Sequence, residues 1–291
     1  MNIAEYLFAV YSITSFAFGA CVASFLNVCI WRLPREESVV SPPSHCPKCN
    51  KPIKWYNNIP VFSWIILRGR CADCKESISP RYMIVEFMGG MLFLLAYFQF
   101  AIPFFFKSYP LLGLMPIASV FTMMVEWLVI AGLILGSFID LDHYYLPDRV
   151  TLGGMILGVP LSFLVPELQG CTDGVDALIW SVSGMAGGFL FLWILGIVAS
   201  KCFKKEAMGF GDVKLLGAVG AFFGPVAALM TIIVSAFVGS IVGVALIARG
   251  KTKLGGYTAI PYGPFIAIGV LVWMYWGNPI VSWYLSFFAA K

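Results

Sequence analysis

Charged side chains are scarce in this sequence. Asp, Glu, Lys and Arg together make up 12% of the residues, whereas 60% are hydrophobic and 16% are aromatic. The mean hydropathy of +0.87 lies far outside the range of a soluble globular domain. The scarcity of charge therefore excludes a soluble fold and predicts an all-α protein that crosses a membrane several times.

We expect neither a cleavable leader nor a basic surface for nucleic acid in this sequence. The first apolar stretch has neither the charged n-region nor the small-residue cleavage site of a signal peptide, so we expect it to stay as a membrane anchor. The net charge of +4 comes from basic residues in and beside the loops between apolar stretches. It indicates membrane topology, and we predict no nucleic-acid partner.

Eight apolar stretches are candidates for transmembrane helices, each of which needs about 20 residues to cross a bilayer. They cover residues 4–32, 83–106, 114–138, 150–165, 175–199, 213–223, 226–248 and 260–288. The stretch at 150–165 is short, and the one at 213–223 crosses only inside the helix bundle or where the bilayer is thin. The predicted architecture is a bundle of about eight transmembrane helices.

The basic residues gather on one side of this arrangement. Eight spans place four loops on the same side, namely residues 33–82, 139–149, 200–212 and 249–259. With its flanking residues, this side holds 17 of the 19 Lys and Arg, and only Lys107 and Lys291 fall opposite. Because Lys and Arg are retained in the cytoplasm, we predict that these loops are cytoplasmic and that both termini lie outside.

The loop at 33–82 is the one long hydrophilic segment, and it contains two Cys-x-x-Cys pairs. Cys46 and Cys49 form the first pair, and Cys71 and Cys74 follow after 21 intervening residues. This spacing is close to that of a four-thiolate zinc ribbon. Disulfides are the alternative, but thiols in a cytoplasmic loop are kept reduced. We therefore predict a structural zinc site that stabilises a loop with little core of its own.

Polar residues near both ends of this loop leave their roles open. Ser24 and Asn27 share one face of the first span, where small and polar residues favour close helix packing, and a catalytic role is the alternative. Glu86 lies about one turn inside the second span. It is expected either to pair with Arg81 or a basic loop residue, or to line a polar pocket.

Two aspartates at the predicted cytoplasmic boundary are the candidate catalytic groups. Asp140 ends the third apolar run, and Asp212 lies in Gly209-Phe-Gly-Asp-Val-Lys214 at the entrance to a later one. A carboxylate at the edge of the hydrocarbon is costly unless it is hydrated, paired or used in function. We expect Gly209 and Gly211 to form a flexible turn alongside which another backbone can lie.

Two charged residues close to this pair have structural interpretations. Lys214, two residues beyond Asp212, either tunes that carboxylate or contacts a substrate carbonyl, or it simply anchors its helix on the cytoplasmic side. Asp148 follows Pro147 just before the next apolar stretch, so we predict that it caps that helix.

Two carboxyl groups held together can share one proton, because like charges a few ångström apart resist ionising together. One group then acts as a general base on water, and the other acts as a general acid toward the scissile amide. This is the chemistry of aspartic peptide hydrolysis. The alternative is a proton- or cation-coupled transporter, which the location at one membrane edge and the lack of an inverted repeat disfavour.

The complete set of motifs resembles the bacterial type IV prepilin peptidases. The matching segments are Ser24-Phe-Leu-Asn27, Arg32-Leu-Pro34, the two Cys-x-x-Cys pairs, Asp140-Leu-Asp-His-Tyr-Tyr-Leu-Pro-Asp148 and Gly209-Phe-Gly-Asp-Val-Lys214. They follow the family order over nearly the whole chain. Flagellin-type peptidases share the aspartate pair but, as a group, lack the tetracysteine loop.

The resemblance implies a bifunctional enzyme of the bacterial inner membrane. Such enzymes remove the leader of type IV prepilins and of type II secretion pseudopilins on the cytoplasmic side, then methylate the new N-terminal amine with S-adenosylmethionine. It implies that Asp140 and Asp212 are the catalytic pair. The family links the loop to methylation, which makes Glu86 and Arg81 candidates for methyl transfer or loop support. A Rossmann-type Gly-rich loop is missing, so the loop and helix ends must form the methyl-donor site.

We expect three parts in this chain. They are a first transmembrane helix (1–32), a cytoplasmic tetracysteine loop (33–82) and a transmembrane peptidase bundle (83–291). The sequence departs from the family pattern at Ala23, where Gly is usual, and at Met83, where Pro is usual. Both positions flank the tetracysteine loop, and neither affects the aspartate pair.

Overall fold

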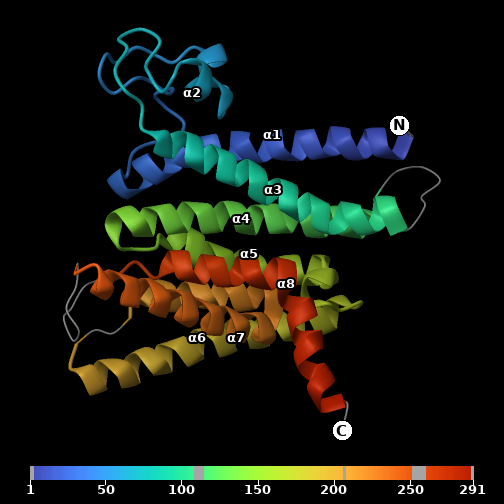
Figure 1. The fold of residues 1–291 in the computed structure, drawn as a ribbon. Helices are drawn as coiled ribbons and strands as arrows, with labels where there is room; N and C mark the ends of the chain where they lie inside the picture. Colours follow the sequence, from blue (N-terminus) through green and yellow to red (C-terminus); the bar gives the residue numbers. More distant parts are fainter. Residues whose placement is uncertain (1–2, 108–114, 206–207, 251–259, 290–291) are drawn as a thin grey trace. The chain divides into compact units, whose positions relative to one another are not determined.

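The computed structural model describes residues 3–107, 115–205, 208–250 and 260–289, and the regular elements in them are helices. The predicted all-α class is therefore confirmed (Figure 1). The chain divides into two compact units, Met1–Leu135 and Gly136–Lys291. The boundary falls inside α4 (Ile117–His143), so this helix contributes to both units.

The first unit consists of long helices and a loop with short helical turns. Before α4 it contains α1 (Ile3–Arg32), η1 (Leu33–Arg35), η2 (Trp55–Asn57), α2 (Phe62–Ile66) and α3 (Pro80–Lys107). α1 and α3 pack closely because small residues face each other, and a Cβ on Gly89 would overlap Ala23. Asn27 Nδ2 donates a hydrogen bond to the Tyr82 carbonyl oxygen at 3.1 Å. This contact is the helix-packing role predicted for Asn27.

Aromatic side chains fill the space between α3 and the first-unit part of α4. The rings of Phe93 and Trp127 stack with centroids 5.1 Å apart, and Trp127 Nε1 donates to the Phe93 carbonyl oxygen at 3.0 Å. The neighbouring Glu126 is 4% exposed, and its Oε2 has no hydrogen-bond partner in the described part of the chain. Glu126 lies in the unit that does not contain the aspartate pair.

The second unit begins with the end of α4, and its described residues form four further α-helices and one short 3-10 helix. It contains α5 (Asp148–Leu164), η3 (Pro166–Gln169), α6 (Gly174–Phe203), α7 (Phe210–Ala248) and α8 (Gly263–Ala289). Six helices of the described chain are long and apolar enough to cross a membrane, namely α1, α3, α4, α6, α7 and α8. The protein is thus a multi-pass membrane protein.

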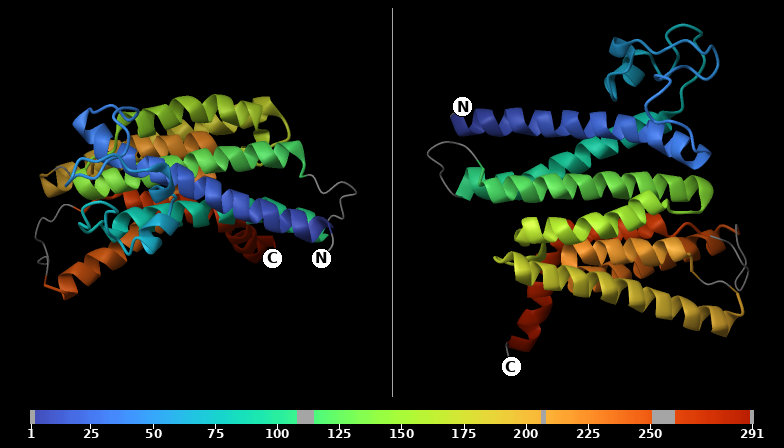
Figure 2. Two further views of the ribbon diagram at one scale, coloured as in Figure 1. Left: turned by 90° about the horizontal axis from the view of Figure 1, so that it is seen from above. Right: turned by 180° about the vertical axis from the view of Figure 1, so that it is seen from behind.

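The 39 residues of α7 are two helical segments that fold back on each other. Gly224 has non-helical backbone angles (φ 81°, ψ −179°) and is followed by Pro225. A Cβ on Gly188 of α6 would lie 2.9 Å from the Leu216 oxygen and 3.3 Å from Ala228 Cβ. Leu216 and Ala228 are twelve residues apart, which is about 18 Å along a straight helix. Both can lie next to Gly188 only if the chain reverses direction between them. The two segments run side by side in Figure 2.

This reversal agrees with the two stretches predicted at 213–223 and 226–248. Most residues of the first segment, Leu215–Gly224 among them, are buried. The short stretch therefore lies inside the bundle, as its length required. With α5 and the two segments of α7, the helices match the eight predicted stretches. Residues 251–259, most of the last predicted basic loop, lie outside the described residues.

Candidate active site

Asp140 lies in the last turn of α4, where its side chain is 5% exposed. Its Oδ2 accepts a hydrogen bond from the backbone N–H of Gly263 at 2.8 Å. Gly263 is the first residue of α8 and is 123 positions away in the sequence. The end of α4 is therefore fixed to the start of α8 at the candidate catalytic carboxylate.

Asp212 lies in the first turn of α7 and is 8% exposed. Gly209 is the N-cap residue of this helix, and its backbone N–H donates to the Asp212 carboxylate. Asp212 is the third residue of this helix. Its carboxylate reaches back to the N–H of the N-cap residue, a hydrogen-bond donor that has no partner within the helix. The carboxyl groups of Asp212 and Asp140 are close enough to interact electrostatically.

The predicted flexible turn around Asp212 is wrong in its conformation. Gly209 is extended (φ −69°), and Gly211 is part of α7. Neither glycine has a left-handed backbone conformation. The glycines are needed instead because a larger side chain would crowd its neighbours. A Cβ on Gly211 would lie 3.0 Å from Leu146 Cβ, and one on Gly209 would lie 3.2 Å from Asp212 Oδ2.

The segment before α8 forms another wall of the site. The hydroxyl groups of Tyr262 and Ser235 are 2.9 Å apart, and the Tyr262 ring packs edge-on against Phe265. Burial raises the pKa of Tyr262, the hydrogen bond to Ser235 opposes this, and the nearby Asp212 carboxylate adds to the rise. Tyr262 and Gly263 thus lie next to the two aspartates, one beside each.

Leu146 provides apolar packing at the same place. Its side chain is 7% exposed and would contact a Cβ on Gly211, at 3.0 Å, and a Cβ on Gly263, at 3.1 Å. One leucine therefore touches the start of α7 and the start of α8. It keeps these two helix ends close to the end of α4.

Lys214 and Asp148 form an ion pair beside the site. Lys214 Nζ lies 2.6 Å from Asp148 Oδ1, and it also lies 5.1 Å from the centre of the Phe210 ring. The prediction that Asp148 caps α5 is wrong, because Pro147 is the N-cap residue and Asp148 is the first helical residue. Asp148 instead binds Lys214 and so ties the start of α5 to the start of α7.

Sequence reasoning missed Gly263 and Tyr262 as parts of the site. The two prolines in Pro261-Tyr262-Gly263-Pro264 disfavour a regular helix across this segment, and α8 begins within it, at Gly263. No local pattern reveals that the Gly263 N–H meets a carboxylate from a distant helix. The two prolines that bracket the motif were the available signal that this backbone is held in one conformation.

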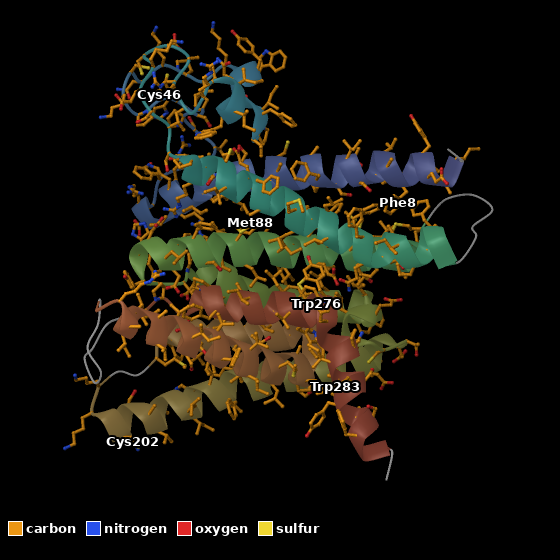
Figure 3. All side chains as sticks on the ribbon, viewed as in Figure 1. Phe8, Cys46, Met88, Cys202, Trp276 and Trp283 are labelled. Carbon is orange, nitrogen blue, oxygen red and sulfur yellow. The ribbon has the colours of Figure 1, made fainter. Side chains whose placement is uncertain are left out.

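The tetracysteine loop of the first unit contains two turns of the same design. Cys46 N–H donates to the Lys51 oxygen and Cys71 N–H to the Glu76 oxygen, at 3.0 and 2.8 Å. The fourth residue after each of these cysteines has a positive φ, 54° at Asn50 and 62° at Lys75. Each Cys-x-x-Cys pair is thus carried by a tight knuckle. Figure 3 shows Cys46 in this loop.

The four thiols are arranged as a metal-binding cluster. The sulfur atoms of Cys46, Cys49, Cys71 and Cys74 all lie within 4.8 Å of one another, and the Cys46 and Cys74 sulfurs are 3.8 Å apart. A zinc ion with Zn–S bonds of about 2.3 Å places tetrahedral sulfur ligands about 3.8 Å apart. Hydrogen bonds from the backbone N–H groups of Cys49 and Lys48 lower the pKa of the Cys46 thiol to about 6. The four thiols and the distances between their sulfur atoms therefore fit a zinc ion.

Glu86 connects α3 to the tetracysteine loop. Its Oε2 accepts a hydrogen bond from the Val61 backbone N–H at 2.8 Å. Val61 has φ 65°, which is rare for a β-branched residue and shows that its neighbours constrain this turn. Arg81 lies in the first turn of α3. The structure brings Glu86 into contact with the loop, and a role in methyl transfer stays a prediction.

The fold and the site together define a class of protein. It is a multi-pass membrane protein with two buried, interacting aspartates at helix ends and a tetracysteine loop. The chain belongs to the Type IV leader peptidase family, whose model matches residues 127–244, and residues 17–100 match the Bacterial Peptidase A24 N-terminal domain.

Curated relatives resemble this chain over most of its length. A prepilin leader peptidase/N-methyltransferase of Aeromonas hydrophila is 33% identical over 94% of this chain and 93% of its own. The protein of the same name from Legionella pneumophila is 32% identical over 93% of both chains. One from Myxococcus xanthus is 37% identical over 84% of this chain and 65% of its own length. No solved structure gives a significant match. The relatives do not support the transporter alternative.

Proposed function

We propose that this protein cleaves the leader from type IV prepilins or pseudopilins and methylates the new N-terminus. The observation that supports the cleavage step most directly is the meeting of Asp140 and Asp212 in one buried site. Membership of the leader peptidase family and the names of the relatives support both activities. The substrates follow from those names.

Cleavage requires a base for water and an acid for the leaving amine, and the two carboxyl groups supply both. One carboxylate takes a proton from water while the water oxygen attacks the scissile carbonyl carbon. The other carboxyl gives its proton to the amide nitrogen, and the C–N bond breaks to give a carboxylic acid and an amine. Asp140 and Asp212 are held for this exchange by backbone N–H groups at Gly263 and Gly209.

The site faces the cytoplasm of the bacterial inner membrane in this proposal. The distribution of Lys and Arg between the loops supports this orientation. Both aspartates lie at helix ends, next to the basic loop residues and away from the middle of a span. A substrate whose leader is cytoplasmic and whose following segment enters the membrane would meet the site at that boundary.

The tetracysteine loop binds a structural zinc ion, held by Cys46, Cys49, Cys71 and Cys74. Four thiolates complete a tetrahedral shell and leave no open position for a substrate. The ion stabilises the loop, which has few buried apolar side chains. Two connections fix the loop to the membrane helices, from Glu86 to Val61 and from Arg32, whose guanidinium donates to the Ser38 and Pro42 oxygens.

Methylation requires a methyl donor, which we take to be S-adenosylmethionine. It supplies an electrophilic methyl group that the new N-terminal amine accepts. The described residues do not define a pocket that is matched to this molecule. Ala23 and Met83, the two departures from the family pattern, lie in helices α1 and α3, and Ala23 is buried against Gly89.

The proposal is tested with purified protein, a prepilin and intact-mass measurement. Asp140→Asn and Asp212→Asn should each lower cleavage by about 10²- to 10⁴-fold, because each removes an acid–base group. Asp142→Asn, an exposed carboxylate two residues from Asp140, should cleave like the wild type. Normal trimming by either of the first two variants would contradict the assigned pair.

A further inference from the structure

Large apolar side chains are exposed on the tetracysteine loop around α2. They are Trp55, Phe62, Ile65 and Ile66, here called the loop patch. Trp55 is 81% exposed and Ile66 is 76% exposed. Exposed apolar groups in such proximity mark an interaction surface when nothing within the unit covers them.

The contact between Glu86 and Val61 fixes the position of the loop patch along the axis of the membrane-spanning helix α3. Glu86 is six residues inside the apolar span that begins at Pro80, which is about 9 Å along a helix axis. Its carboxylate accepts a hydrogen bond from the backbone N–H of Val61, the residue just before α2. In Figures 1 and 2, α2 lies beside the loop-side ends of α1 and α3 and does not extend beyond them. The loop patch is therefore level with the first turns of a membrane-spanning helix.

Other side chains at this level are typical of the membrane–water interface. Trp31, at the end of α1, is half exposed, and the Arg35 guanidinium stacks on its ring at 3.7 Å. Tyr82, in the first turn of α3, is also exposed. Trp and Tyr gather where acyl chains meet headgroups, and Arg extends toward the headgroups.

The charge of the loop favours an anionic surface. Residues 33–79 contain seven Lys and Arg against four Asp and Glu. Lys54, Arg68 and Arg70 flank the loop patch in sequence, and all three are exposed. Basic residues around exposed apolar groups give the pattern of an interfacial anchor on anionic lipid.

We propose that the loop patch inserts into the headgroup region of a bilayer that contains anionic phospholipid. Phe62, Ile65 and Ile66 enter the boundary between headgroups and acyl chains, and the flanking basic residues contact the phosphates. The tetracysteine loop then lies along the membrane surface as a peripheral element. This inference is independent of the catalytic assignment.

Photocrosslinking of the full-length protein tests the inference. Ile66 is replaced by benzoylphenylalanine, and the protein is placed in vesicles of phosphatidylcholine and phosphatidylglycerol. A matched variant has the same residue in place of Lys48, an exposed polar position of the first knuckle. We expect adducts with the mass of one phospholipid to form several-fold more at position 66 than at position 48.

Two results would overturn the inference. They are equal lipid yields at the two positions, and adducts at position 66 that join mainly to protein, which would indicate a second copy or another part of the chain. Zinc content is measured in both variants, because equal zinc shows that the knuckles are intact.

Hydrogen exchange of the unmodified protein gives a second measurement that does not depend on the photoreactive residue. Backbone amides of residues 62–67 should exchange several-fold more slowly in the anionic vesicles than in vesicles of phosphatidylcholine alone. Amides of residues 46–51 should exchange alike in both. Equal exchange at 62–67 would contradict insertion driven by anionic lipid.

Discussion

Backbone N–H groups are the hydrogen-bond partners that the structure shows at both aspartates. Asp140 accepts a hydrogen bond from the N–H of Gly263, and Asp212 accepts one from the N–H of Gly209. A backbone donor is placed by the fold of its segment, so these contacts position each carboxylate only while the helix ends stay together. The space that the glycines leave is therefore part of the site.

Gly263→Ala is predicted to reduce cleavage by about 10²-fold or more. The added Cβ would lie 2.9 Å from Asp140 Oδ2 and 3.1 Å from Leu146 Cδ2, so the carboxylate must move. A displacement of about 1 Å at a reacting group costs about this much in rate. Steady-state cleavage of a prepilin measures the effect, which we expect in kcat more than in KM.

Gly153→Ala is the matched control for this change. Gly153 lies in α5, and a Cβ there has nothing within 4 Å. It should cleave at the wild-type rate. Equal activity of the two alanine variants would contradict a role for the space at Gly263.

Within α7, the reversal at Gly224-Pro225 leaves a backbone carbonyl group without its helical partner. Pro225 has no N–H, so the Ala221 oxygen four residues earlier lacks its helical partner. Three side chains replace it: Ser162 at 2.9 Å, Ser181 at 2.6 Å and Gln169 at 3.1 Å. The segment that carries Asp212 is therefore held in the bundle by donors from α5, α6 and η3.

Removing these donors should destabilise the protein in steps. Ser162→Ala or Ser181→Ala alone should lower the free energy of unfolding by less than about 1 kcal/mol, because two donors remain. Both changes combined with Gln169→Leu should cost about 1–3 kcal/mol, since the buried Ala221 oxygen is then unsatisfied. Thermal unfolding in detergent measures this.

Ser183→Ala is the control for the carbonyl cluster. Its hydroxyl is exposed and donates to the Trp180 oxygen of its own helix at 3.0 Å. It should leave the melting temperature unchanged. A triple variant that is as stable as Ser183→Ala would show that the three donors do not hold the reversal.

Cys46→Ser is predicted to lower bound zinc from one ion per chain to substoichiometric levels. Three thiolates remain, and the tetrahedral site loses one of its four ligands. Metal analysis of the purified protein measures the loss. Cys202→Ser serves as control, because this exposed cysteine is outside the cluster. Wild-type protein without zinc, or full zinc in Cys46→Ser, would contradict the site.

Much of this element structure could be predicted from the sequence. Apolar length located the helices, and Gly224-Pro225 separated 213–223 from 226–248, because neither residue continues a helix easily. The cysteine spacing predicted a four-sulfur cluster, and the four thiols do converge. These predictions succeed because length and spacing are local properties.

Contacts between distant segments could not be predicted in the same way. The pair of Lys214 with Asp148 spans 66 positions, and the contact of Glu86 with the Val61 N–H involves a backbone group that has no sequence signal. The start of α7 was expected to be a flexible turn, yet Gly209 acts as an N-cap and Asp212 is helical. Here the packing of neighbouring helices decided the conformation.

At the scale of the whole molecule, the aspartate pair and the tetracysteine loop lie in different compact units. The predicted division at residues 32 and 82 stays a prediction. Asp140 and Asp212 are both in the second unit, whereas the four cysteines and Glu86 are in the first. The family resemblance links the tetracysteine loop to methylation, and a change at one aspartate leaves the unit that contains this loop intact. We therefore expect cleavage and methylation to be separable.

The roles of Asp140 and Asp212 are tested by the intact mass of a prepilin after incubation with the wild-type protein, Asp140→Asn or Asp212→Asn, with and without S-adenosylmethionine. The wild type should remove the leader and, with the methyl donor, add one methyl group. Each variant should leave the prepilin uncut, yet methylate a pilin that was already trimmed. Leader removal by either variant at the wild-type rate would contradict the central claim that Asp140 and Asp212 carry out the cleavage.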